Sequence, residues 1–442
     1  MALLSVVPIF RDLERKFQIA QERRSPQQRP AIRSHPVLNV IAERLRCGSQ
    51  PGRRRDNCKI CLSVEGGGMR GSISGGMLAA MHDMGLLKAF DCVYGSSAGA
   101  INAAYFVAAQ PEGVRIYYSD LANSSFFDVR RLFSSEDKPA LSVDYLLDDV
   151  VGGTRVTSRG PHDNSLKWQR VLRSPVSLKT VTSSLSKGRS VVLDKFATKA
   201  DLIVALKASS KIPVLAGQPV MVGKEKLADA LLFEPIPIKS ALNDRCTHLL
   251  ILLTRPDRAK LRSNVPAIWD WPWIRDRLPA EARTLRPQFQ SSEEYNAERA
   301  WLRFSTLFPE HAASLLSDQK HASHSITHHQ PQPPRSASRI ATIYSDIFAV
   351  QSPLHEEPPT YPPPQSMSTT VGGSRAGGSG PYMYAVSVPY GSRQVNQLEM
   401  NTTRLKEAIA LGYSTMVETV RHSAIGGVVD VKQLRLSPFD LR

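Results

Sequence analysis

Residues 62–99 read LSVEGGGMRGSISGGMLAAMHDMGLLKAFDCVYGSSAG, and two glycine-rich turns in this stretch decide the expected fold. Each turn follows a short apolar segment, at residues 62–65 and 90–94, and we expect both segments to be buried strands. Apolar residues then recur at helical spacing over residues 73–87 and 98–109, so a helix is expected after each turn. Alternating strands and helices are typical of an α/β sheet.

The second turn, Gly95-Ser96-Ser97-Ala98-Gly99, has the G-x-S-x-G pattern between an expected strand and an expected helix. A tight turn of this kind holds the serine in a strained conformation, and the flanking Gly95 and Gly99 relieve the crowding. The hydroxyl group then lies over the amino end of the next helix, whose dipole favours developing negative charge. Ser97 is therefore predicted to be a nucleophile, whereas Ser96 has the wrong spacing and is expected to pack.

The first turn, Glu65-Gly66-Gly67-Gly68-Met69-Arg70-Gly71, contains three successive glycines. They leave backbone N–H groups uncovered, so the loop is suited to hold an oxyanion. Arg70 either orients this loop or meets a phosphate group. A plainer interpretation is a tight turn in which the glycines only avoid a steric clash.

A dinucleotide-binding site is a more specific alternative for the same loop, since Gly66, Gly68 and Gly71 fit the G-x-G-x-x-G pattern after a strand. That site needs an acidic residue at the end of the next strand to hold the ribose. Asp91 stands near the start of that strand, and the Ser97 turn occupies its end. The dinucleotide hypothesis is therefore the weaker one.

A nucleophilic serine needs a base, and the histidines offer no clear candidate. His82 falls on an expected helix, and His248 opens an expected apolar strand at residues 248–253. Among the acids Asp229 stands out, because it precedes the apolar stretch 230–237. A carboxylate in such a stretch is costly to bury unless it is paired, hydrogen-bonded or functional. The residues alone leave open which of these roles Asp229 has.

Taken together, the two glycine motifs and the Asp229 segment resemble the patatin-like phospholipase family. Its pattern is [D/E]-G-G-G-x-R-G, then G-x-S-x-G, then a distant D-G-[G/A], and the likeness covers most of residues 60–255 and about 381–420. The resemblance implies a three-layer α/β/α sandwich with a mainly parallel sheet. It also implies an enzyme with a Ser–Asp dyad that cleaves fatty-acyl esters of phospholipids, galactolipids or acylglycerols.

By this resemblance Ser97 attacks the ester carbonyl and Asp229 takes its proton, and water later releases the fatty acid from an acyl-enzyme. The glycine loop, with the N–H groups of Gly67 and Gly68 at its centre, forms the oxyanion hole. No cofactor and no metal are implied. One departure is that Ala230 follows Asp229 where the family has glycine, and alanine would strain a turn that needs a glycine conformation. A catalytically weak or silent relative that binds lipid surfaces is therefore a second hypothesis.

Composition divides the chain into four parts, which are residues 1–56, 57–309, 310–380 and 381–442. The first part is basic, and an apolar stripe at Phe10 and Phe17 predicts an amphipathic helix that either contacts anionic lipid or packs on the domain. The second is the expected catalytic domain, with further elements at 190–193 and 198–209. The third holds His/Ser, Pro-rich and Gly/Ser tracts, so we expect a disordered insertion. The last is expected to close the catalytic domain with a strand at 383–388 and a long helix.

The formal net charge of +16 favours an anionic partner, for which a membrane or lipid-droplet surface is the expected choice. No nucleic-acid motif accompanies the charge. No apolar run is long enough to span a membrane. The five cysteines are scattered and odd in number, and the Cys58/Cys61 pair lacks a second ligand pair for zinc, so we expect a reducing compartment, cytoplasmic or peripheral to a membrane.

Overall fold

The computed structural model describes residues 34–132, 138–154, 156–157, 160–161, 164–259, 272–322 and 381–431. The expected helix around Phe10 and residues 323–380 lie outside this range. Spatial contacts divide the chain into two units: Ile32–Pro309 with Pro381–Arg442, and Met1–Ala31 with Glu310–Gly380.

One sheet organises the larger unit, with the strand order β10-β9-β1-β2-β5-β8-β7 and with β6 paired to β5. The neighbours from β10 to β5 are parallel, and β6, β7 and β8 join antiparallel. The strands are β1 (Ile60–Val64), β2 (Cys92–Ser96), β5 (Ser177–Ser184), β6 (Arg189–Leu193), β7 (Val220–Val222), β8 (Glu225–Ala228), β9 (His248–Leu252) and β10 (Tyr382–Val386). Every residue of β1, β2 and β9 is buried, as is typical of parallel strands that are covered on both faces.

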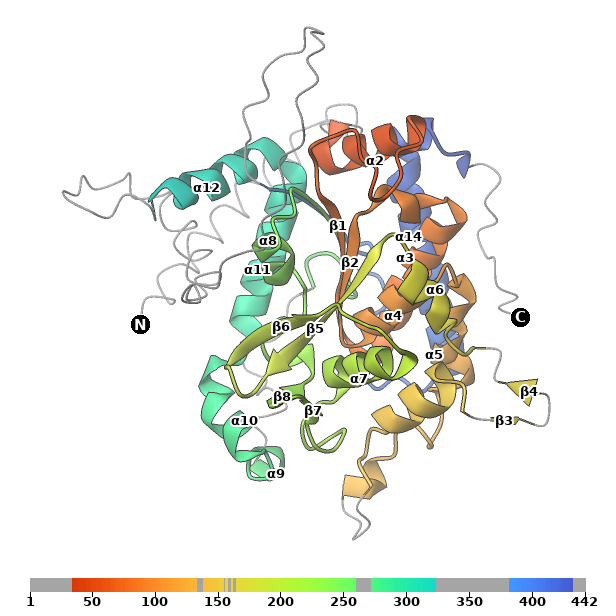
Figure 1. The fold of residues 1–442 in the computed structure, drawn as a ribbon, viewed down its shortest axis with the longest axis vertical. Helices are drawn as coiled ribbons and strands as arrows, with labels where there is room; N and C mark the ends of the chain where they lie inside the picture. The colour runs from red at the N-terminus through yellow and green to blue at the C-terminus, as the bar shows by residue number, and fades with distance from the viewer. Residues whose placement is uncertain are drawn as a thin grey trace, which may run out of the picture. The chain divides into compact units, whose positions relative to one another are not determined.

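Helices cover both faces of this sheet. Helices α3, α4 and α14 lie on one side of β1 and β2, and α8 and α11 lie on the other (Figure 1). The helices are α2 (Pro36–Arg46), α3 (Gly71–Asp83), α4 (Ala98–Val107), α5 (Ile116–Ser119), α6 (Trp168–Arg173), α7 (Lys199–Ser210), α8 (Lys239–Asn243), α9 (Pro272–Arg275), α10 (Ala280–Leu285), α11 (Ser292–Leu307) and α14 (Thr402–Arg421). A small hairpin, β3 (Val156–Thr157) with β4 (Gly160–Pro161), stands apart from the sheet. The expected α/β/α sandwich with a mainly parallel sheet is confirmed.

The strand and helix that follow the insertion belong to this core. Strand β10 is an edge strand of the sheet, and α14 packs closely on α3. Two glycines allow the approach: a side chain at Gly76 would collide with the backbone of Ile409, and one at Gly412 with the backbone of Ile73. The two helices therefore touch through main-chain atoms, which explains how a segment so distant in sequence is fixed on the domain.

The structure corrects the expected boundaries in several places. The first long helix ends at Asp83, because Gly85 adopts the left-handed conformation with φ 68°. The long helix expected near the end of the chain, whose apolar face would begin at Leu398, starts only at Thr402. Strands β5, β7 and β8 were not expected, since their sequences alternate weakly between apolar and polar residues.

Part of the segment expected to be disordered is helical. Helix α12 spans Pro309–Ala322, and it is the described part of the unit that contains Glu310–Gly380. A proline at the first helical position and a run of good helix formers after it account for this helix. The His/Ser, Pro-rich and Gly/Ser tracts that favoured disorder lie mostly after this helix.

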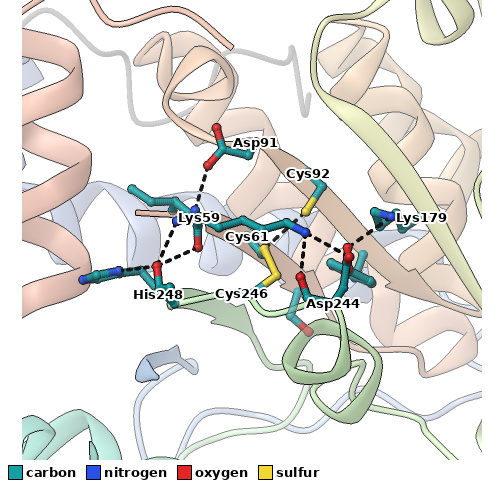
Figure 2. The surroundings of a disulfide bond; sticks show 12 residues. Lys59, Cys61, Asp91, Cys92, Lys179, Asp244, Cys246 and His248 are labelled. Atoms are coloured by element: carbon teal, nitrogen blue, oxygen red, sulfur yellow. Dashed lines mark hydrogen bonds and ion pairs between the residues drawn. A yellow bond between two sulfur atoms is a disulfide. The ribbon is translucent and has the colours of Figure 1, made fainter. Parts of the chain in front are cut away.

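The cysteines also differ from expectation. The structure bonds Cys61 to Cys246, which is 185 residues away, and the thiol of Cys92 donates to the Cys61 sulfur at 3.2 Å (Figure 2). Of the Cys58/Cys61 pair, Cys61 lies in the buried strand β1 and Cys58 lies before it. The disulfide arises because β9, which follows Cys246, pairs with β1, and that neighbourhood is invisible in the linear spacing. None of the helices among the described residues has both the length and the apolar character needed to cross a membrane.

Candidate active site

The sharp turn between β2 and α4 holds Ser97. Strand β2 ends at Ser96 and α4 begins at Ala98, so Ser97 alone makes the turn, with φ 52° and ψ −125°. A residue other than glycine pays about 1–3 kcal/mol for such a conformation, and this strain is typical of functional sites. Ser96 packs as expected: it is buried, and its hydroxyl donates to the Glu234 carbonyl at 2.8 Å.

The glycines of this turn allow backbone segments to approach closely. A Cβ atom on Gly99 would come within 2.7 Å of the Glu65 carbonyl oxygen, and one on Gly95 within 2.5 Å of the Ala100 Cα. Neither neighbour can move aside, because both are main-chain atoms. The turn therefore seats the first residues of α4 directly on the end of β1.

A second serine fixes the backbone of the turn. The Ser97 N–H donates to the Ser209 Oγ at 2.8 Å, and the Ser209 hydroxyl donates in turn to the Val181 carbonyl at 2.5 Å. Ser209 is fully buried near the end of α7. Ser209 had no sequence signal of this role, because an isolated serine in a helix does not indicate a contact 112 residues away.

Asp229 lies against the Ser97 side chain. The Ser97 hydroxyl donates to Asp229 Oδ2 at 2.8 Å, across 132 residues of sequence. The second carboxylate oxygen, Oδ1, accepts the Leu231 N–H at 2.8 Å, and the Asp229 N–H donates to the Lys211 carbonyl at 2.9 Å. Asp229 stands directly after β8, so the sheet and the end of α7 together hold it in place.

Burial dominates the electrostatics of Asp229. Its side chain is only 1% exposed, and this desolvation raises the pKa of its carboxyl group from 3.8 to about 7. The hydrogen bonds from Leu231 and Ser97 favour the charged form and offset part of that rise. A carboxyl group that titrates near neutral pH is well placed to accept a proton from a hydroxyl group.

The expected strain at Ala230 is absent. Asp229 has φ −48° and caps a short helical turn, η9 (Ala230–Leu232). Ala230 is not among the described residues with positive φ, so it needs no glycine conformation. The chain turns here into a short helix and not through a left-handed residue, so alanine is accommodated without strain.

The glycine loop presents N–H groups beside Ser97. Gly66 donates to the Pro235 carbonyl at 3.0 Å, whereas the N–H groups of Gly67 and Gly68 meet no acceptor in the part of the chain that the structure describes. Gly68 has φ 58°, and a Cβ atom there would lie 2.6 Å from the Gln397 carbonyl oxygen. Only glycine fits this position, and the two adjacent residues with unused donors, Gly67 and Gly68, line the same pocket as Ser97.

Arg70 and Gln397 fix the loop from behind. The Met69 N–H donates to the Gln397 carbonyl at 3.0 Å. With the Gln397 amide assigned so that its oxygen faces Arg70, as the surrounding donors require, that oxygen accepts from the two Nη atoms at 3.1 and 3.2 Å. Arg70 is buried, and this burial lowers the pKa of its guanidinium to about 10, so it stays charged at neutral pH. These contacts favour the orienting role for Arg70. Gln397 lies beyond the insertion and had no sequence signal of this role.

The ends of the loop are anchored as well. The Glu65 carboxylate accepts from the Thr254 N–H at 2.5 Å and its hydroxyl at 2.9 Å, and it also accepts from the Tyr295 hydroxyl. Gly71 begins α3, where a Cβ atom would lie 3.0 Å from the Ala98 Cβ. The whole motif from Glu65 to Gly71 is thus tied to β9, α11 and the Ser97 turn.

These groups meet in a pocket of about 100 Å³. Ser97, Asp229 and Gly66, Gly67 and Gly68 lie at its polar end. The remaining wall is mostly apolar, and its members include Phe126, Phe127, Leu141, Ile212, Leu215 and Leu398. No histidine lines this pocket among the described residues. An apolar pocket of this kind suits a hydrocarbon chain.

The structure gives Asp91 a different place from the one a dinucleotide site requires. Its carboxylate accepts from Arg44 at 2.9 Å, from Arg54 at 2.6 Å and from the Ile60 N–H at 2.8 Å. These contacts lie at the start of β2, at the opposite end from the glycine loop. The acidic residue of this strand therefore lies far from Gly66 and Gly68, and the carboxylate that shares their pocket, Asp229, accepts a hydrogen bond from the Ser97 hydroxyl instead.

The fold and this site define an α/β protein with a strained serine facing a glycine-rich loop. The family model of patatin-like phospholipases matches residues 62–242, which cover both motifs and Asp229. Residues 62–242 therefore match the patatin-like phospholipase family, and the resemblance inferred from the sequence is confirmed.

Two solved structures are similar at low identity. VipD from Legionella pneumophila is 11% identical with a TM-score of 0.35, over 83% of this chain and 67% of that one. The type III effector protein ExoU is 15% identical with a TM-score of 0.23, over 67% of this chain and 70% of that one. Both TM-scores are too low to contribute to the assignment. No curated protein matches the sequence.

Proposed function

We propose that this protein is a lipid acyl hydrolase that cleaves fatty-acyl esters of phospholipids, galactolipids or acylglycerols through a Ser97–Asp229 dyad. One observation carries the proposal: Ser97 Oγ lies 2.8 Å from Asp229 Oδ2 in an apolar pocket, beside two unused N–H groups of the glycine loop. Hydroxyl, base and oxyanion donors are the three parts that acyl transfer from an ester requires.

The reaction begins when the Asp229 carboxylate accepts the Ser97 proton and Ser97 Oγ attacks the ester carbonyl carbon. The N–H groups of Gly67 and Gly68 stabilise the oxyanion that forms. The carbon–oxygen bond to the lipid alcohol then breaks, and the alcohol leaves with the proton held by Asp229. Water attacks the acyl-enzyme by the same route and releases the fatty acid, so Ser97 and Asp229 return to their starting states.

The substrate is best presented at a lipid surface. The acyl chain fits against the apolar wall of the pocket, and the head group stays outside. A net charge of +16 favours binding to an anionic membrane or lipid-droplet surface. Peripheral membrane association is therefore part of the proposal, with the basic amino-terminal segment as a further contact.

Labelling with a fluorophosphonate probe tests the dyad. We expect the wild-type protein to be labelled at Ser97 and to release fatty acid from mixed lipid vesicles, and we expect Ser97→Ala to lose both properties. Ser96→Ala is the matched control, because it removes the neighbouring hydroxyl and leaves the proposed nucleophile. Labelling or esterase activity that survives in Ser97→Ala would overturn the mechanism. A wild-type chain that binds vesicles but is never labelled would point to the silent lipid-binding relative.

A further inference from the structure

Three cysteine side chains converge at the amino ends of the central strands, away from Ser97 (Figure 2). Cys61 lies on β1, Cys92 opens β2, and Cys246 lies just before β9. Their three sulfur atoms are all within 4.8 Å of one another, and all three residues are buried. The proposed hydrolysis uses none of them.

The sheet itself brings these side chains together. Cys61 and Cys92 are opposite one another in the parallel register of β1 and β2. His248, two residues after Cys246, is opposite Ile60 on the other side of β1. Backbone pairing therefore sets the positions of Cys61 and Cys92 and anchors the strand that begins two residues after Cys246.

The structure contains the oxidised form of this cluster. Cys61 and Cys246 form the disulfide, and the Cys92 thiol lies 3.2 Å from the Cys61 sulfur. A cellular dithiol that supplies two electrons and two protons breaks the disulfide and is itself oxidised to a disulfide. The reduced protein then holds three thiols in one enclosed space.

A site made of three sulfur donors, with no nitrogen or oxygen donor, suits a soft metal ion that is stable with three ligands. Zinc and iron–sulfur sites of structural proteins take four ligands, and monovalent copper is stable with thiolates alone. Sulfurs placed about 2.3 Å from one ion in a plane are about 4.0 Å apart. The observed cluster, within 4.8 Å, closes to that size by small side-chain rotations.

We propose that Cys61, Cys92 and Cys246 in their reduced state form a buried three-thiolate site for one monovalent copper ion. The disulfide and the ion exclude each other, because the disulfide occupies two of the three ligands. This site does not depend on the proposed hydrolase activity, since the two lie at opposite ends of β2.

The surrounding charges suit an anionic metal cluster. The Nζ atoms of Lys59 and Lys179 lie 2.9 and 3.1 Å from the two oxygens of Asp244, next to the sulfurs (Figure 2). Asp91 also faces this region, and Arg44 and Arg54 pair with it. Copper with three thiolates carries two negative charges, and the ammonium groups, although they also pair with Asp244 and Asp194, offset a part of the cost of burying them.

Copper titration of the full chain tests the site. The protein is reduced with a phosphine without oxygen, loaded with monovalent copper, and challenged with a chromophoric copper(I) chelator. We expect about one retained ion per chain, and we expect Cys92→Ser to weaken retention by at least about 100-fold. Cys47→Ser and Cys58→Ser are the matched controls, because these cysteines are free and lie outside the cluster.

Two further measurements show whether copper is held by the three cysteines together. Cys246→Ser must show the same loss as Cys92→Ser, and fluorophosphonate labelling or a thermal melt confirms that each variant is folded. Wild type with its disulfide intact must retain no copper. Equal retention by wild type and Cys92→Ser, or no retention by the reduced wild type, would overturn the proposal.

Discussion

Two carboxylates at opposite ends of β2 have opposite surroundings. Asp91, at the amino end, contacts the guanidinium groups of Arg44 and Arg54. Asp229, beyond the carboxyl end, has no ion pair with a lysine or arginine in the described ranges and contacts only an N–H and a hydroxyl group. The first carboxylate is compensated by cations and holds the fold together. The second is left uncompensated, and its raised pKa makes it available for proton transfer.

This contrast shows how charge compensation separates a structural acid from one that is available for proton transfer. Arg44 is 1% exposed and also pairs with Asp56 at 2.8 Å, so that end of the sheet contains a complete ionic network. Such a network is costly to break but has no group free to react. At the other end the protein accepts the cost of an unpaired carboxyl group, as proteins do at sites that must change protonation state.

Replacing Asp229 is the change expected to have the largest effect. Asp229→Asn keeps the shape but cannot accept the Ser97 proton, so we expect kcat/KM for ester hydrolysis to fall by roughly 10⁴-fold. Ser97→Ala in the same assay gives the lower limit of activity. Activity of Asp229→Asn within tenfold of wild type would show that another group is the base.

The same variant has an expected effect on stability. A folded-state pKa of about 7 against an unfolded value of 3.8 means that the native protein binds the proton more tightly, so wild-type stability falls as pH rises from about 4 to 7. Asp229→Asn lacks this penalty, which amounts to at most about 4 kcal/mol. We expect its free energy of unfolding to exceed that of wild type at pH 8 and to approach it near pH 4. Urea denaturation at both pH values measures the difference.

Breaking the ionic network around Arg44 is expected to lower stability and to leave the reactivity of Ser97 unchanged. Arg44→Ala leaves Asp56 and Asp91 without their shared cation, and we expect the free energy of unfolding to fall by about 3–5 kcal/mol. At a temperature where the variant is still folded, the rate of Ser97 labelling should stay within a factor of about two of wild type. Slower labelling in a folded Arg44→Ala protein would contradict the separation of the two ends.

The pH dependence of kcat/KM tests whether Asp229 acts as the base. Since only the ionised carboxyl group accepts a proton, we expect kcat/KM to rise about tenfold per pH unit below pH 7 and to level off above it. The measurement is hydrolysis of a soluble ester whose own charge does not change in this range. A profile that is flat from pH 5 to 8 would mean that the ionisation of Asp229 does not limit the reaction.

The smallest expected effect is that of Ser209→Ala. This change removes the acceptor of the Ser97 N–H and leaves that group unsatisfied in the turn, at a cost of about 1–3 kcal/mol. We expect kcat to fall about tenfold with little change in KM, and we expect Ser209→Thr to recover part of the loss. Ser210→Ala, one residue further along α7, is the matched control.

Much of the fold was predictable where the signal is local. The two strand–turn–helix units of residues 62–109 were found within a few residues, because apolar spacing and glycine position act over short range. The antiparallel strands β7 and β8 were missed because they are short and alternate weakly; they pair with each other across a tight turn, and only the pairing of β8 with β5 joins distant residues. The helical character of Pro309–Ala322 was overlooked because the tracts that follow it dominated the composition.

The sequence by itself determined the conformation of the Ser97 turn and of the glycine loop, because glycines at fixed offsets allow backbone geometries that other residues resist. Only the tertiary structure decided which groups face them. The 2.8 Å contact between Ser97 and Asp229, the support of the loop by Gln397 and the meeting of three cysteines all join residues far apart in the chain. Burial, which sets the pKa of Asp229, is likewise a property of the packed core and not of any segment.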